Sequence, residues 1–284
     1  ACNRAYGHAL VHAHRAGDWR SVADITTRIG VGYMFGPEPV DEGLRWLGAQ
    51  EAQLRGQPVL IGLRAMLEAT RGRFREARAL LAEARARNQE LGARGVEALQ
   101  AEAAWIVESY ADDHGAAEQA IRAGCRLLEE TGASGFLATQ AAELACTLCA
   151  LENDEEAEEW ARRSAALAAS DDVWTQMLWR QALARVAARR GQLAEAERLA
   201  REAVALGGET DLLTAVGDAL TVLAAVLRLA GRQREAAAQA KRALGLYERK
   251  GNTVMAAQAR RISDPVKLHL APQSPVGAET SEPR

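Results

Sequence analysis

Residues 190–203, RGQLAEAERLAREA, combine a helix-breaking turn at Arg190-Gly191 with small residues spaced for one face of a helix. Five segments follow this plan, and they begin at Arg71, Asp113, Leu151, Arg190 and Ala230. We expect their first packed alanines to be Ala77, Ala120, Ala157, Ala196 and Ala236. The successive spacings of 43, 37, 39 and 40 residues are typical of stacked helical hairpins. The sequence therefore predicts an all-α solenoid of antiparallel helix pairs.

The stretch between Pro58 and Pro265 contains no proline, which permits uninterrupted helices. The positions of the turns then predict five pairs and a closing helix without a partner of its own: 59–70 with 74–91, 96–111 with 116–131, 135–150 with 154–169, 172–189 with 192–206, 211–229 with 232–250, and 252–262 alone. The residues expected to form the turns inside the pairs are Gly72, Gly115, Asn153, Gly191 and Gly231.

Three regions follow from these patterns. Residues 1–58 are expected to form an irregular helical N-terminal cap with helices near 3–16, 19–34 and 40–55. Because the chain opens with Ala1 and runs at once into helical sequence, we interpret this cap as truncated from something longer. Residues 59–262 are the array of five pairs with its closing helix. Residues 263–284 are rich in Pro, Ser, Gly and Glu and are expected to be a disordered tail.

Composition argues against several classes of protein. The net charge of -3 comes from 35 basic and 38 acidic residues that are interleaved along helix faces, which disfavours nucleic acid as a partner. No apolar run has the length of a membrane span. Four irregularly spaced cysteines do not form the disulfide framework of a secreted domain, so we expect a cytoplasmic protein.

The sequence gives no basis for catalysis, a cofactor or a metal. It contains no Gly-Lys dipeptide and therefore no phosphate-binding G-x-x-x-x-G-K loop. Cys146 and Cys149 have CxxC spacing but lie inside a predicted helix, and His8 and His12 share a helical face without the glutamate of a zinc motif. We interpret both pairs as structural, and we expect that this chain is not an enzyme.

Leu-Ala pairs followed by small residues resemble the tetratricopeptide repeat family: Leu144-Ala145 with Ala157, Ala161 and Ser164; Leu183-Ala184 with Ala196, Ala200 and Ala203; Leu223-Ala224 with Ala236, Ala240 and Ala243. The resemblance implies a right-handed superhelix whose concave groove is lined by the first helix of each pair. Residues 35–47, 170–206 and 227–261 also resemble the C-terminal repeat region of bacterial multidomain signalling regulators. Those regulators join a nucleotidyl cyclase or DNA-binding module to a signalling ATPase.

The resemblance also implies which side chains line the groove. Counting from the Leu-small pairs gives a partner-binding set of one tryptophan with acids, hydroxyls, thiols, an amide and arginines: Glu102, Trp105, Ser109, Asp112, Thr139, Cys146, Cys149, Gln181, Arg185, Asp218, Thr221 and Arg228. An aromatic anchor among several hydrogen-bonding groups is suited to holding a peptide. Ordinary solvated positions remain the alternative interpretation of the same residues.

The sequence thus favours a noncatalytic scaffold that binds a protein segment, or a neighbouring domain of its own parent chain, and acts as the regulatory arm of an intracellular signalling protein. A first alternative is a solenoid that senses a small effector and controls an attached ATPase. A polar pocket near Trp105 and Arg185 would favour that alternative. A second alternative is the C-terminal fragment of an enzyme such as an adenylate or guanylate cyclase.

Overall fold

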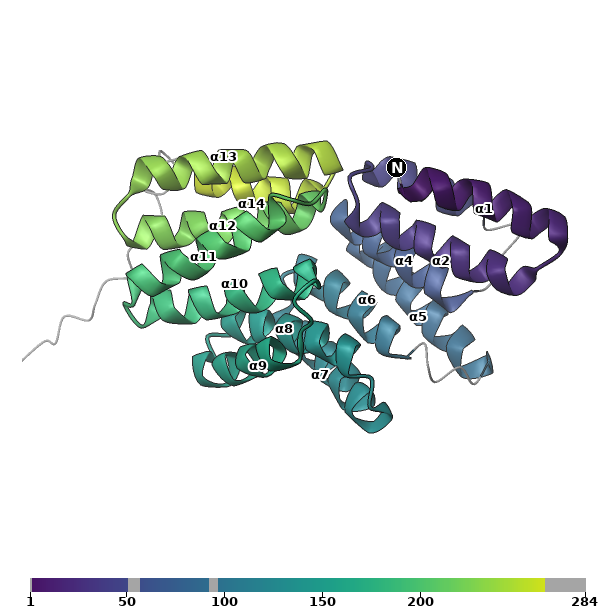
Figure 1. The fold of residues 1–284 in the computed structure, drawn as a ribbon, viewed down its shortest axis with the longest axis horizontal. Helices are drawn as coiled ribbons and strands as arrows, with labels where there is room; N and C mark the ends of the chain where they lie inside the picture. Colours follow the sequence, from purple (N-terminus) through teal and green to yellow (C-terminus); the bar gives the residue numbers. More distant parts are fainter. Residues whose placement is uncertain (1, 51–56, 92–96, 264–284) are drawn as a thin grey trace, which may run out of the picture.

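The computed structural model describes residues 2–50, 57–91 and 97–263, and these residues form helices joined by short turns (Figure 1). Over the described ranges there are fourteen helices and no strand: α1 Cys2–Ala16, α2 Trp19–Phe35, α3 Val40–Gln50, α4 Pro58–Thr70, α5 Phe74–Leu91, α6 Glu97–Tyr110, α7 His114–Thr131, α8 Ser134–Ala150, α9 Asp154–Leu167, α10 Val173–Arg189, α11 Leu193–Gly207, α12 Leu213–Leu229, α13 Gln233–Lys250 and α14 Thr253–Ser263.

The helices stack as antiparallel pairs. Helix α4 pairs with α5, α6 with α7, α8 with α9, α10 with α11, and α12 with α13, and each second helix also packs on the first helix of the next pair. The expectation of an all-α solenoid is therefore confirmed. At the N-terminus α1 packs on α2, and α2 contacts both α3 and α4. Helix α3 ends at Gln50, so the predicted continuation to residue 55 lies outside the described residues, as does the predicted disordered tail beyond 263.

The turns inside the five pairs are identical in backbone geometry. In each turn one residue has a left-handed φ of 60° to 76°, and the amide of the next residue donates to the carbonyl oxygen five positions earlier, as in a Schellman cap. The left-handed residues are Gly72, Asp112, Glu152, Gly191 and Gly231. The expectations of Gly115 and Asn153 were wrong, because two turns use an acidic residue at the position that glycine occupies elsewhere.

The spacing between equivalent buried alanines is more regular in the structure than the spacing predicted from the sequence. Ala117 has no solvent exposure, whereas Ala120 is only half-buried, so the expected packed alanine of the second pair was wrong by three residues. The buried alanines Ala77, Ala117, Ala157, Ala196 and Ala236 lie 40, 40, 39 and 40 residues apart. Alanine at these positions lets the two helices of a pair approach closely, because a larger side chain would overpack the contact.

The two ends of the described array meet. The buried ammonium group of Lys250, at the end of α13, donates to the carbonyl oxygens of Tyr33, Gly36 and Glu38 at 2.7, 2.7 and 2.9 Å. Burial lowers the pKa of Lys250 to about 8. Phe35 of α2 also contacts the ring of Trp174 in α10, at 5.4 Å between centroids. In Figure 1 the end of α13 accordingly lies beside the segment that joins α2 to α3.

Helix α14, predicted to have no partner, packs on α13 and reaches across the interior of the molecule. The Asn252 amide donates to Tyr110 Oη at 3.2 Å, and Thr253 Oγ1 donates to the Thr70 carbonyl oxygen at 3.3 Å. These bonds join the last helix to α6 and α4, more than 140 residues earlier in the chain. The inner surface of the array is therefore closed by α14 on one side.

Candidate functional site

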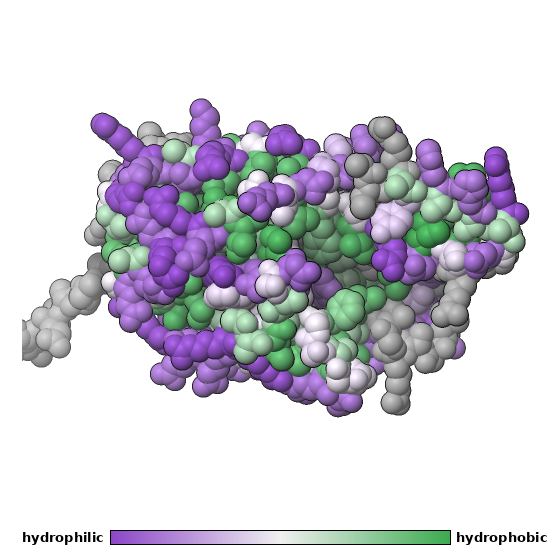
Figure 2. Space-filling view, in the orientation of Figure 1, coloured by the Kyte–Doolittle hydropathy of each residue, from purple (hydrophilic) through white to green (hydrophobic). Residues whose placement is uncertain are grey.

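The concave side of the array holds a polar cavity of about 840 Å³. Its walls come from the inner helices α6, α8, α10 and α12, and α14 and the first residue of α5 close it. We call it the polar cavity. Figure 2 shows one face of the molecule, which is hollowed near its middle and exposes apolar residues there among hydrophilic ones. A volume of this size is within the range of ligand-binding pockets.

Nine of the twelve residues expected in the groove line the polar cavity: Trp105, Ser109, Asp112, Cys146, Cys149, Gln181, Arg185, Asp218 and Thr221. They come together because residues three and four apart share a face of a helix, and the first helices of successive pairs present equivalent faces to the same side. Trp105 and Ser109 on α6 and Gln181 and Arg185 on α10 show this spacing directly.

The other three expected residues lie elsewhere. Glu102 lines a different cavity, described below. Thr139 shares a 2.7 Å hydrogen bond with the hydroxyl of Thr175, which ties α8 to α10. Arg228, in the last turn of α12, lines neither cavity.

Part of the wall was not predicted from the sequence. Helix α14 contributes Met255, Gln258 and Arg261 to the polar cavity. The spacing of small residues inside a helix pair predicts how its two helices pack, but it does not predict where α14, which follows the last pair, lies. The available signal was the small-residue face of α14, where Ala256 and Ala259 are buried against the preceding helices.

Buried hydrogen bonds fix several side chains of the wall. Tyr247 Oη donates to Asp218 Oδ1 at 2.6 Å, and Trp105 Nε1 donates to Thr147 Oγ1 at 2.8 Å. Burial raises the pKa of Asp218 to about 6, and the Tyr247 hydroxyl and the nearby Arg185 guanidinium act in the opposite direction. The orientation of Trp105 is thus set by a bond to α8, and its half-buried ring also packs against apolar residues of the neighbouring helices.

Arg185 differs from Arg189, the other arginine that α10 contributes to the wall. Arg189 donates to Asp154 at 2.7 Å, whereas Arg185 has no hydrogen bond or ion pair with any residue in the described part of the chain. Its guanidinium therefore faces the polar cavity with all five donors available, near the buried carboxyl of Asp218. An arginine of this kind can bind a carboxylate or a backbone carbonyl of a ligand.

The two thiols of the wall are poorly suited to redox chemistry. Cys146 Sγ donates to the Leu178 carbonyl oxygen at 3.6 Å, and Cys149 Sγ donates to that of Ala182 at 3.5 Å. Burial raises the pKa of Cys146 to about 12 and also raises that of Cys149. The thiolate is the reactive form of cysteine, so both thiols are expected to be unreactive. Their role is to join α8 to α10 by hydrogen bonds.

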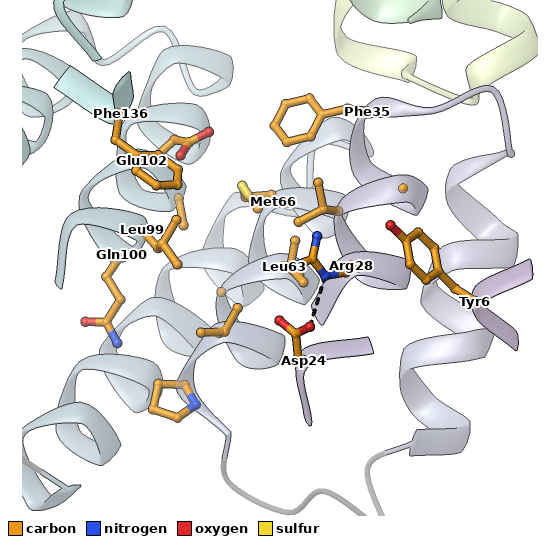
Figure 3. A pocket seen from close by; sticks show the side chains of 16 residues that line it. Tyr6, Asp24, Arg28, Phe35, Leu63, Met66, Leu99, Gln100, Glu102 and Phe136 are labelled. Atoms are coloured by element: carbon orange, nitrogen blue, oxygen red, sulfur yellow. Dashed lines mark hydrogen bonds and ion pairs between the residues drawn. The ribbon is translucent and has the colours of Figure 1, made fainter. Parts of the chain in front are cut away.

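A second cavity of about 540 Å³ lies between α2, α4 and α6, and we call it the apolar cavity (Figure 3). Leu63, Met66 and Leu99 are among the apolar residues of its wall, with Phe35 and Phe136 from α2 and α8. The Asp24–Arg28 ion pair, at 3.0 Å, lies on its α2 side, and Glu102 of α6 lies beside Phe136. Phe136 is 61% exposed, which is high for a phenylalanine.

No helix in the described ranges is both long enough and apolar enough to cross a bilayer. A search of curated proteins gives no match. Residues 178–210, which cover most of α10 and all of α11 in the fourth pair, match the model of the tetratricopeptide repeat family.

Several solved structures have a similar fold. The complex of NprR with its cognate peptide NprX has a TM-score of 0.63 and 13% identity, covering 94% of this chain and 86% of that one. The Rap protein complexed with Competence and Sporulation Factor also has a TM-score of 0.63 and 13% identity, with coverage of 84% and 68%. The apo form of NprR from B. thuringiensis has a TM-score of 0.53 and 13% identity, with coverage of 91% and 79%.

Proposed function

We propose that this chain, whose residues 178–210 match the tetratricopeptide repeat model, is a noncatalytic interaction module that binds a peptide segment in its polar cavity. One observation carries the proposal. The polar cavity gathers an oriented tryptophan, an arginine without a partner among the described residues, and hydrogen-bonding groups from four successive pairs and α14. Tryptophan and arginine are the residues that most often dominate the energy of protein interfaces.

The cellular role that we infer is regulatory. NprR and Rap, which are similar in fold, were crystallised with NprX and with Competence and Sporulation Factor. By analogy with these two, we propose that peptide binding here controls a signalling protein, of which this chain is the regulatory arm. The partner is a protein or peptide, or another domain of the same parent chain. The unpaired thiols Cys125, Cys146 and Cys149 support a reducing, cytoplasmic location.

A small effector is the second candidate ligand, and the cavity itself favours it. Trp105 and Arg185 line the same polar pocket, whose volume is also that of a small-molecule site. In this version the ligand changes how an attached ATPase assembles. A parent enzyme such as a nucleotidyl cyclase is compatible with either ligand.

Capture from a defined peptide pool tests the leading proposal. The purified chain is incubated with an equimolar pool of random hexapeptides, unbound peptides are removed by gel filtration, and retained peptides are identified by mass spectrometry. We expect a restricted set of sequences, with dissociation constants that rise at least tenfold in Trp105→Ala/Arg185→Ala, because both anchors are lost.

The matched control is Trp160→Ala/Arg163→Ala, which removes the same residue types from α9, outside both cavities. Capture by this control should equal that of the wild type. Equal capture by all three proteins would refute the site, and retention of no peptide by the wild type would refute peptide binding. In the latter case, native mass spectrometry of protein isolated from its source cells would reveal a bound small effector.

A further inference from the structure

Glu102 of α6 and Glu143 of α8 are close enough for the charge of one to disfavour the charge of the other. Glu102 lines the apolar cavity, and Glu143 is fully buried, with 0% exposure. Neither carboxyl oxygen of Glu143 has a hydrogen-bond partner in the described structure, although the Trp174 indole lies near enough to favour the ionised form. Native proteins rarely leave a buried carboxyl group without a donor.

No cation of the described chain compensates for these two groups. Arg28 is the one basic residue among the described residues that line the apolar cavity, and it is paired with Asp24 at 3.0 Å. Burial raises the pKa of Glu102 to about 7, and burial together with repulsion from Glu102 raises the pKa of Glu143 well above its ordinary value. The pair therefore has several unused acceptor positions and lacks a positive charge.

The surroundings of the pair are aromatic and apolar. Phe35 and Phe136 line the same cavity, and Figure 3 shows Phe136 beside Glu102 and Phe35 across the cavity from them. Leu99 and Phe136 are 37% and 61% exposed, so a considerable apolar area remains uncovered. Exposed apolar patches on a folded protein commonly mark binding sites, and aromatic faces attract cations.

We propose that the Glu102 end of the apolar cavity binds a primary ammonium group on an apolar carrier, either a lysine side chain or the free N-terminus of a peptide. The ammonium offers three donors to groups that, when ionised, can only accept, and its charge offsets their repulsion. The remaining apolar surface covers the carrier. That the carrier is a peptide rests on the proposed function, whereas the recognition of the ammonium does not.

Three probes of equal chain length test the ammonium site directly. Hexylammonium, hexan-1-ol and hexanoate are titrated into the full chain, and binding is followed by NMR chemical shifts of labelled methyl groups of Leu63, Met66 and Leu99. We expect hexylammonium to bind at least tenfold more tightly than hexan-1-ol, and hexanoate to bind least. Glu143→Gln and Glu102→Gln should each remove this preference while leaving hexan-1-ol binding within twofold.

The control variant is Glu97→Gln, which neutralises an exposed glutamate on the same helix α6 and should preserve the preference. Either glutamate variant suffices if the other does not fold. Equal affinity for the amine and the alcohol in the wild type would overturn the proposal, as would an unchanged preference in the folded variants, or no binding of hexylammonium at all.

A peptide arm identifies the source of the ammonium. Hexapeptides retained from the random pool are resynthesised with an acetylated N-terminus or with norleucine in place of each lysine. Weakened binding of the first form indicates the N-terminus, and weakened binding of the second form indicates lysine. If amines bind but no peptide is retained, the proposed function fails while the ammonium site stands. If peptides are retained and both changes leave their binding unchanged, the ammonium site fails while peptide binding stands.

Discussion

At the scale of single residues, packing in the last pair depends on one glycine. Tyr247 of α13 has no solvent exposure, and its ring lies directly over Gly217 of α12. A Cβ atom at position 217 would lie 2.6 Å from the ring, a distance that real contacts do not show. The close approach positions the Tyr247 hydroxyl on Asp218, at the wall of the polar cavity.

Gly217→Ala should therefore destabilise the protein by about 1 to 3 kcal/mol, because the ring must move to make room. Gly245→Ala is the matched control, since Gly245 lies inside α13 with no atom near its would-be Cβ, and this change should stabilise the protein by about 0.5 to 1 kcal/mol. Urea denaturation measures both values. Equal effects of the two substitutions would contradict the packing described here.

The buried alanines show how much of the packing can be predicted from residue type alone. Four of the five were predicted, and Ala117 was missed because Ala116, Ala117 and Ala120 are all alanine, so composition cannot distinguish the buried one. The turns were missed for a related reason. Asp112 and Glu152 adopt a left-handed conformation that is rare for residues other than glycine, and the surrounding pair, not the local sequence, imposes it.

At the scale of helices, α6 and α8 each carry a carboxyl group that disfavours the charge of the other. Glu102 and Glu143 both bind a proton more tightly in the folded chain than in the unfolded chain, because their pKa values are raised. Between about pH 4.5 and pH 7 the folded state therefore holds more protons than the unfolded state. Stability from this pair is present at low pH and is lost as the pH rises.

Glu143→Gln should reduce this dependence on pH, because one of the two repelling groups becomes neutral. We expect the free energy of unfolding of the wild type to fall more steeply between pH 5 and pH 8 than that of the variant, because the raised pKa of Glu143 no longer contributes. Urea denaturation at the two pH values gives the difference, with Glu97→Gln as the exposed control on α6. Parallel pH profiles of wild type and Glu143→Gln would show that the carboxyl groups do not interact.

Helix boundaries and pairing were largely predictable, since small-residue spacing and turn residues are local signals. The inner position of α14 was not predictable in this way. It depends on Asn252 and Thr253 bonding to Tyr110 and Thr70, partners that only the curvature of the whole array brings near. The same holds for the electrostatic repulsion between Glu102 and Glu143, which lie far apart in the sequence. The sequence placed Glu102 in the groove but did not indicate a second cavity.

At the scale of the whole molecule, the ends of the array are held together by Lys250. Repeat arrays ordinarily make contacts only between neighbouring repeats. Here one buried ammonium group bonds to three carbonyl oxygens of the segment from Tyr33 to Glu38. The polar cavity is enclosed by helices that precede and follow the middle of the chain, and none of the residues joined by Lys250 lines it.

Lys250→Met should open the junction, because three carbonyl oxygens lose their donor at once. We expect a loss of about 1 to 3 kcal/mol in stability and faster amide hydrogen exchange in residues 33–40 and 250–253, with little change in the middle pairs. Lys241→Met, an exposed lysine on the same helix α13, is the control. Unchanged exchange at the junction in Lys250→Met would show that the ends are held by other contacts.

Because its ends meet, this array cannot change its number of repeats freely. In an open solenoid, a duplicated or deleted unit of about forty residues merely lengthens or shortens the structure. Here the same event between α4 and α13 would carry Lys250 away from the carbonyl oxygens that it binds. Lineages of this protein are therefore expected to vary in loops and in surface composition while their count of helix pairs stays constant.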